Sequence, residues 1–199
     1  MSLFVRNEDL KTYIRRYPIT SLFLTANVVV FILMTISGGS TKTNILLKFG
    51  AYYQEGVLQG EWYRFVAPLF IHIGLEHLLF NCFAILIFAP GLEIILGSFR
   101  YLLLYLATGI IGFVITFFFS GPQVLAAGAS GAIFGIYGLY AYLMRHRREL
   151  LDWSSRQTIT PIIIFGLIST FAIPGISIYG HLGGLVLGYL LGFLLLRKS

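Results

Sequence analysis

Long apolar stretches alternate with short polar segments along the chain, and this pattern predicts helices that cross a membrane. A helix needs about 20 apolar residues to span the hydrocarbon core of a bilayer. Six stretches approach this length, near residues 19–37, 75–96, 101–120, 128–144, 157–174 and 179–196. The fourth is short, which suits a helix that begins below the membrane surface. The pattern therefore predicts an all-α, polytopic membrane protein built as a bundle of six transmembrane helices.

The segment before the first stretch, residues 1–18, is more polar than the rest of the chain. Apolar residues such as Leu10 and Ile14 stand there among charged ones. Two interpretations fit this composition: a short amphipathic helix on the inner face of the membrane, or a frayed terminus. No later connection is long enough to separate domains. We therefore expect a cytoplasmic, amphipathic segment at 1–18 and a single domain at 19–199.

Composition and charge support a membrane protein and indicate its orientation. The 199 residues are 57% apolar and 11% charged, with a mean hydropathy of +0.85, unlike a soluble globule. The net charge is +6, but the basic residues flank apolar stretches, so nucleic acid is not an expected partner. Eleven of the 14 Lys and Arg residues would lie on one side of a six-helix arrangement. By the positive-inside rule, both termini are expected in the cytoplasm of a cell-membrane protein.

The longest predicted loop, residues 38–71, is unusually apolar and rich in aromatic residues, among them Trp62 and Tyr63. Such rings favour the boundary between hydrocarbon and water, so we expect this loop to lie partly in the outer interface. Arg64 stands among these aromatic residues. Its side chain either extends to water across an apolar surface or braces the loop by donating hydrogen bonds to backbone carbonyls.

Polar side chains open three of the six stretches. His77 and Asn81 lie on one face at the start of the second, Ser130 opens the fourth within Gly128-Ala129-Ser130-Gly131, and His181 opens the sixth. These three stretches would all run from the outside to the inside, so their polar residues converge on one layer below the outer surface. Polar groups at membrane depth are costly and usually face the interior of a bundle. This layer is the candidate functional site.

Small residues recur at helical spacing on two of these stretches, at Gly131, Gly135 and Gly138 in the fourth and at Gly184, Gly188 and Gly192 in the sixth. Taken alone, they need no more than the close approach of two helices as an explanation. If the two strips pack against each other, Ser130 and His181 lie at the same level of one interface.

A serine hydroxyl in this layer has the neighbours that nucleophilic catalysis requires. A serine needs a base to remove its proton, and the candidate bases at this depth are His77 and His181. The N–H of Ser130, the amide of Asn81 and the ring of His77 can supply donors for an oxyanion. Phe134, one turn after Ser130, is placed to hold the imidazole by ring contact. We expect a serine–histidine dyad in which packing replaces an aspartate.

Two other kinds of site use the same residue types. His72, His77 and His181 could together bind zinc, although the segment from His72 to His77 reads H-x-x-x-E-H and matches neither zinc-protease motif. A small transporter would relay protons through ionisable groups at mid-depth, and no acidic residue is expected there. We expect neither a metal nor a cofactor.

Four segments carry a resemblance to a known family: Glu61-Trp62-Tyr63-Arg64, His72-x4-His77-x3-Asn81, Gly128-Ala129-Ser130-Gly131 and Gly180-His181-x2-Gly184-x3-Gly188. In this order and on these stretches, they resemble the rhomboid family of intramembrane serine proteases, of the basic six-span bacterial type. The resemblance implies that Ser130 is the nucleophile and His181 the general base. It also implies an oxyanion hole of His77, Asn81 and the Ser130 amide, with His72 as a polar network residue.

The same resemblance implies partners and a route to the site. The expected partners are membrane lipid and client proteins whose transmembrane segments are cleaved near the outer face; the oligomeric state is not predicted. Phe80 and Phe165 are expected to meet across the bundle as a lateral gate.

Glu93, about 12 residues or roughly 18 Å along the helix from Asn81, belongs to the inner end, where a capping or packing role is expected.

The chain departs from the family pattern in three places. Tyr63 precedes Arg64 where a tryptophan is usual, Gly180 stands where alanine is common, and Phe134 replaces a tyrosine that often stacks on the histidine. None of these changes removes a catalytic group, so we expect activity. The alternative is an inactive relative that binds or escorts transmembrane clients; such relatives typically lack the serine or the histidine, and both are present here.

Overall fold

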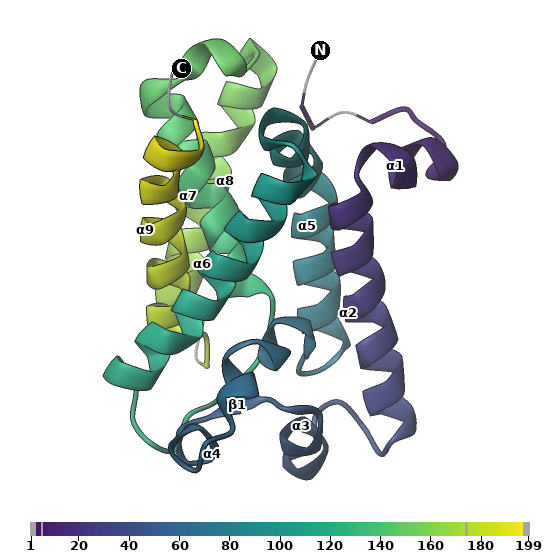
Figure 1. Cartoon of the computed structure of the whole chain (residues 1–199), viewed down its shortest axis with the longest axis vertical. Coiled ribbons are helices and arrows are strands. Elements are labelled where there is room, and N and C mark those ends of the chain that lie inside the picture. Colours follow the sequence, from purple (N-terminus) through teal and green to yellow (C-terminus); the bar gives the residue numbers. More distant parts are fainter. Residues whose placement is uncertain (1–2, 5, 174, 197–199) are drawn as a thin grey trace.

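The architecture is a bundle of long helices with a cap of short elements at one end (Figure 1). The computed structural model describes residues 3–4, 6–173 and 175–196. Arg197 and Lys198, which contribute to the predicted charge bias, lie outside the described residues. The six longest helices are α2 (Pro18–Ile36), α5 (Leu75–Leu96), α6 (Ser98–Phe119), α7 (Ser130–His146), α8 (Trp153–Ala172) and α9 (Ile178–Leu195).

Short elements connect and cap these helices. They are α1 (Leu10–Arg16), α3 (Thr43–Phe49), β1 (Tyr52–Tyr53), α4 (Gln54–Leu58), the 3-10 helices η1 (Trp62–Phe65), η2 (Ala67–Phe70) and η3 (Arg148–Leu150), and β2 (Leu125–Ala126). Each of the six predicted apolar stretches is helical, and no predicted end differs from the observed one by more than four residues. The all-α prediction is confirmed, with one antiparallel pair of two-residue strands as an addition.

Four of the long helices are apolar and long enough to cross a membrane within the described part of the chain: α2, α5, α6 and α9. Helix α7 has only 17 residues, and α8 begins with the polar residues Ser154, Ser155 and Arg156. The chain is therefore a multi-pass membrane protein in which these four helices are the candidate spans.

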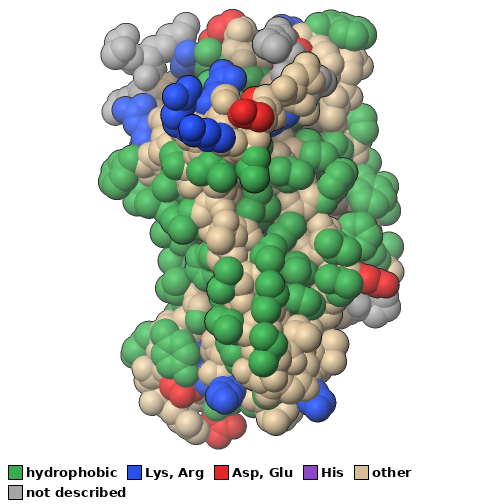
Figure 2. All heavy atoms as spheres, turned by 90° about the vertical axis from the view of Figure 1, so that its right-hand side faces the viewer, with side chains coloured by type: hydrophobic (Ala, Val, Ile, Leu, Met, Phe, Trp, Pro, Cys, Tyr) green, Lys and Arg blue, Asp and Glu red, His purple; other side chains and the backbone are tan. Residues whose placement is uncertain are grey.

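The surface has the distribution of side chains that lipid requires. On the face that contains α2, hydrophobic side chains cover the middle, and Lys and Arg lie toward both ends (Figure 2). Leu22 and Leu33 of α2 are 56% and 50% exposed. Both described ends of the chain lie at one end of the bundle, and α3, α4 and β1 lie at the other (Figure 1). The long loop therefore caps the end opposite the termini.

Helix α7 forms the centre of the bundle and packs closely against α9. Twelve of its 17 residues are buried. A Cβ atom added at Gly184 would overlap the carbonyl oxygen of Gly131, and one added at Gly188 would overlap that of Gly135. The predicted contact between the two glycine strips is thus confirmed. It brings the first turns of α7 and α9 to the same level.

The end of the bundle near the termini is fastened by side chains from distant parts of the sequence. The buried carboxylate of Glu93 accepts hydrogen bonds from the N–H groups of Ile19 and Thr20, both at 2.9 Å. A carboxylate is favourable at a helix N-terminus because it satisfies free donors and opposes the helix dipole. The expected capping role of Glu93 is confirmed, and its capped helix is α2.

The described residues of the N-terminal segment pack against the same end of the bundle. The N–H of Leu3 donates to Ser155 Oγ at 3.0 Å, and the ring of Phe4 meets those of Phe88 and Tyr140 edge-on. Helix α1 follows, with Leu10 74% exposed. This segment therefore both contacts the bundle and presents apolar side chains outward.

The expected meeting of Phe80 and Phe165 is wrong. The two residues are 74% and 72% exposed, and no ring contact joins them in the described part of the chain. Successive residues on an α-helix point about 100° apart. Phe80 therefore faces outward because its neighbour Asn81 faces the interior.

Candidate active site

Ser130 is held at the start of α7 by the long loop. Strand β2, which precedes it, pairs with β1 so that Ala126 lies opposite Tyr52. The N–H of Gly128 donates to the carbonyl of Pro68 at 2.8 Å. These bonds fix the turn that leads into α7. The loop at 38–71 thus positions the segment that carries the serine.

His181 lies in the first turn of α9, below a capping serine. The hydroxyl of Ser177 accepts a hydrogen bond from the N–H of Gly180 at 3.1 Å. The imidazole of His181 is 7% exposed. The ring of Phe134 lies nearly parallel to it, with 4.1 Å between the centroids and 17° between the planes, as expected for a residue one turn after Ser130. Stacking of this kind holds the imidazole in one plane.

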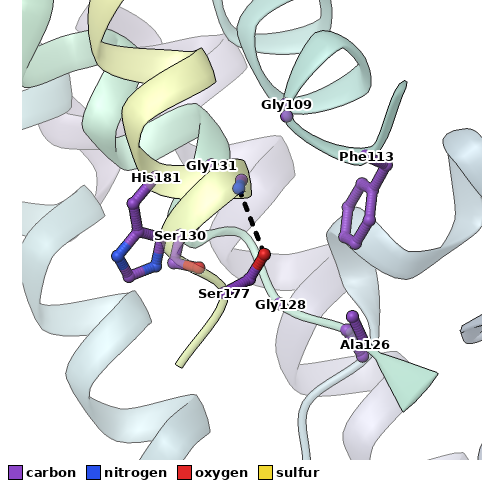
Figure 3. A pocket seen from close by; sticks show the side chains of 11 residues that line it. Gly109, Phe113, Ala126, Gly128, Ser130, Gly131, Ser177 and His181 are labelled. Carbon is purple, nitrogen blue, oxygen red and sulfur yellow. Dashed lines mark hydrogen bonds between the residues drawn. The ribbon is translucent and has the colours of Figure 1, made fainter. Parts of the chain in front are cut away.

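Ser130 and His181 line the same cavity between α6, α7 and α9, and their side chains lie next to each other (Figure 3). The cavity measures about 20 Å³, enough for one water molecule. Its other lining residues are Gly109, Gly112, Phe113, Ala126, Ala127, Gly128, Gly131, Ser177 and Gly180. The two side chains share no hydrogen bond within the described residues; in unliganded sites such bonds often form only with substrate.

Hydrogen-bond donors are available at the start of α7. The residue before Ser130, Ala129, provides no side-chain cap. The first N–H groups of a helix have no carbonyl partner within that helix. Among the described residues the N–H of Ser130 has no recorded acceptor, so it is available to bind an anionic oxygen beside the hydroxyl.

The ring of His77 lies against the turn that carries the serine. A Cβ atom on Gly128 would come within 2.6 Å of His77 Cε1 and 2.7 Å of Nε2. The φ of Gly128 is +123°, a backbone conformation that favours glycine. Glycine at this position thus allows both the turn and the approach of the ring.

Asn81 and His72 are buried beside His77. The amide nitrogen of Asn81 donates to the carbonyl of His77 at 2.7 Å, and a carboxamide has a second N–H to offer. The ring of His72 meets that of His77 edge-on, at 5.2 Å between centroids. Neither Asn81 nor the two histidines line the cavity in the described part of the chain. Of the three, His77 is the one that lies against the Gly128 turn.

Among the described residues, no three His, Cys, Asp or Glu side chains converge as metal ligands would. His72 and His77 are adjacent, whereas His181 is bonded to a residue of α8. The zinc trio that the sequence left open is therefore not assembled.

Arg64 braces the long loop, which decides between the two interpretations of this residue. Its side chain is buried, and one guanidinium nitrogen donates to the carbonyls of Ala51 at 2.8 Å and Leu47 at 3.1 Å. It also pairs with Glu61 at 2.6 Å. The hydrogen bond from this guanidinium lowers the pKa of the Glu61 carboxyl.

Sequence reasoning missed Ser177, which lines the cavity. It also missed Thr170 of α8. Its Oγ1 lies 2.8 Å from Nδ1 of His181. The sequence contained a signal for Thr170, because this polar residue lies near the end of an apolar stretch that was predicted to face outward, at the level of the polar layer. The contact itself depends on how α8 is rotated.

A serine hydroxyl at the start of a helix, beside a buried imidazole in a bundle with an apolar surface, is the arrangement that a serine hydrolase working within the membrane would need. The comparisons with known proteins agree. The family model of the Rhomboid domain matches residues 59–198. The chain therefore belongs to the rhomboid family.

Three relatives show how far the likeness extends. YdcA of Bacillus subtilis (strain 168), whose name places it among the rhomboid proteases, is 36% identical over 197 residues, which are 99% of this chain and 98% of the relative. The rhomboid protease GluP of the same organism is 41% identical over 85% of this chain and 33% of the relative. Rhomboid-type serine protease 2 of Emericella nidulans is 34% identical over 69% of this chain and 28% of the relative. The chain thus spans about a third of the two longer relatives, and it is a serine endopeptidase by class.

Proposed function

We propose that the protein cleaves transmembrane segments of client proteins with a dyad of Ser130 and His181. The observation that carries this proposal is the shared cavity that both side chains line, at the glycine contact of α7 and α9. The stack of Phe134 on the imidazole supports it, because a base must be held still to accept a proton.

The chemistry follows from the roles of these groups. The imidazole of His181 takes the proton of the Ser130 hydroxyl as its oxygen attacks the scissile carbonyl. The N–H of Ser130 donates to the oxyanion that forms, and the His77 ring and the second N–H of Asn81 complete the oxyanion hole. The imidazolium then returns the proton to the leaving amine. Water hydrolyses the acyl-enzyme in a second round of the same steps, with His181 again the base.

The proposed topology has six spans, with both termini in the cytoplasm and the site open toward the outer face. The Lys and Arg bias supports the orientation. The serine lies at the loop end of α7, opposite the termini. Helix α7 has only 17 residues. It can complete a span if its first residue, Ser130, lies below the membrane surface. In this arrangement residues 1–18 lie on the cytoplasmic side and residues 19–199 form the protease domain.

The test compares the wild-type protein with Ser130→Ala and His181→Ala in proteoliposomes that contain a transmembrane substrate. We expect cleavage to be abolished in both variants, because removing either member of a catalytic unit costs nearly as much as removing both. A fluorophosphonate probe should label the wild type and not Ser130→Ala. Ser154→Ala, which changes an exposed serine at the start of α8, is the matched control and should cleave and label normally.

Two results would contradict the proposal. Substantial cleavage by Ser130→Ala or His181→Ala would exclude the dyad. A folded wild-type protein that neither labels nor cleaves, yet still binds transmembrane segments, would favour the client-binding alternative.

A further inference from the structure

The imidazole of His181 has a hydrogen-bond partner on a third helix. Thr170 Oγ1 of α8 lies 2.8 Å from His181 Nδ1 and also 2.8 Å from the carbonyl oxygen of Gly166, one turn earlier. The Thr170 side chain is buried, at 2% exposure. These two contacts together determine where the protons lie.

The hydroxyl of Thr170 has one proton and two neighbours at bonding distance. A carbonyl oxygen can only accept a hydrogen bond, so the short contact with Gly166 requires the hydroxyl proton. The oxygen of Thr170 must then accept a hydrogen bond from His181, which places a proton on Nδ1 of the imidazole. In the neutral ring the other nitrogen, Nε2, is left unprotonated. Figure 3 shows a ring nitrogen of His181 turned toward Ser130.

We propose that Thr170 is a positioning residue that holds His181 in the tautomer with a free Nε2, the form able to take the Ser130 proton. This inference rests on the proposed dyad. It assigns to a neutral hydroxyl the orienting role that a carboxylate has in serine–histidine–aspartate sites.

The surroundings of Thr170 support a dedicated contact. Of the residues of α8, only Ser155, Ile159 and Thr170 are buried among those described. Two residues near Thr170 face outward, with Ile168 61% and Phe171 64% exposed. The same turn approaches the stacked ring, because a Cβ on Gly166 would lie 3.3 Å from Phe134 Cζ. Thr170 thus joins the base to a helix that is otherwise mostly exposed.

The experiment compares Thr170→Val with Thr170→Ser. Valine keeps the shape but removes the acceptor, whereas serine keeps the hydroxyl. We expect Thr170→Val to lower kcat for a transmembrane substrate by about 10- to 100-fold with KM nearly unchanged, and Thr170→Ser to stay within about threefold of wild type. Thr158→Val is the matched control, because Thr158 lies on the same helix and likewise bonds one turn back, to the carbonyl of Ser154.

A spectroscopic readout separates positioning from a structural role. In the Ser130→Ala background, the ¹⁵N shifts of His181 should report the Nδ1–H tautomer while Thr170 is present, and a mixture of tautomers once Thr170→Val is added. Wild-type kcat together with unchanged ¹⁵N shifts in Thr170→Val would overturn the inference. If the valine variant does not fold, Thr170→Ala and Thr170→Ser provide the same comparison. Failure of the dyad would appear instead as cleavage by Ser130→Ala, so the two proposals are tested separately.

Discussion

Single residues at the site are constrained by several neighbours at once. Gly128 has a φ of +123°, donates its N–H to Pro68 and leaves room for the ring of His77. Thr170 satisfies a helix carbonyl and an imidazole with one hydroxyl. Each of these residues has little freedom to change because its contacts come from different elements.

Gly128→Ala should therefore impair the site strongly. The added Cβ would meet the His77 ring at 2.6 Å, and the backbone conformation costs a non-glycine residue about 1–2 kcal/mol. We expect at least a tenfold fall in kcat, measured with a transmembrane substrate, because the serine turn or the ring must move. Gly121→Ala is the control, since a Cβ there meets nothing within 4 Å. Equal activity of the two variants would show that the turn tolerates displacement.

At the scale of the helices, the bundle divides into a tightly packed part and a looser one. Helices α7 and α9 approach so closely that glycine Cα atoms face carbonyl oxygens. In lipid, where apolar side chains gain little by leaving the solvent, such close van der Waals packing is a main source of helix association. Helix α8 has few buried residues by comparison. A rigid pair of helices therefore carries the serine and the histidine, and α8 supplies the threonine.

Gly188→Ala tests the rigid pair. Its Cβ would overlap the carbonyl oxygen of Gly135, and overpacking of this kind costs about 1–3 kcal/mol. We expect a lower free energy of unfolding in detergent and a loss of cleavage, because the start of α9 must move away from Ser130. Val186→Leu enlarges an exposed residue of the same helix and should change neither quantity. If Gly188→Ala changes neither the free energy of unfolding nor cleavage, then α7 and α9 can move apart without loss of stability or activity.

The two ends of the bundle differ: one is held together by contacts between distant segments, and the other carries the candidate active site. The end near the termini is fastened by Glu93 of α5, which caps the start of α2, and by the contact of Leu3 with Ser155. The opposite end carries the braced loop and the candidate active site. Between them lies a surface of apolar side chains (Figure 2). In a membrane, this arrangement would place the two ends on opposite sides.

Cysteine labelling tests that orientation. With Cys82 replaced by serine, we expect Lys42→Cys and Gln123→Cys in intact cells to react with a membrane-impermeant maleimide. Lys11→Cys and Arg148→Cys should react only after the membrane is made permeable. All four positions are exposed in the structure, so access within the protein is matched. The reverse pattern would place the active site on the cytoplasmic side.

Hydropathy and helical spacing alone determined the six helices and the two glycine strips of α7 and α9, and they predicted that Ser130 and His181 would share one level if those strips packed together. These features are local: an apolar run predicts its own helix, and glycines at intervals of three and four residues define a face wherever that helix packs. The family resemblance, carried by four short segments, followed from the same local information. The capping or packing role of Glu93 could also be expected, because its distance along the helix placed it at the end of the bundle away from Asn81.

Only the tertiary structure decided which side chains meet. The bond of Thr170 to His181, the outward direction of Phe80 and Phe165, and the brace that Arg64 forms with Ala51 all depend on helix rotation and on the path of the loop. An error of one residue in phase turns a side chain by about 100°, and hydropathy does not fix that phase when a helix is apolar on every side. In α5 and α8 the apolar residues do not gather on one side of the helix, so packing against neighbouring helices set the direction of each polar group.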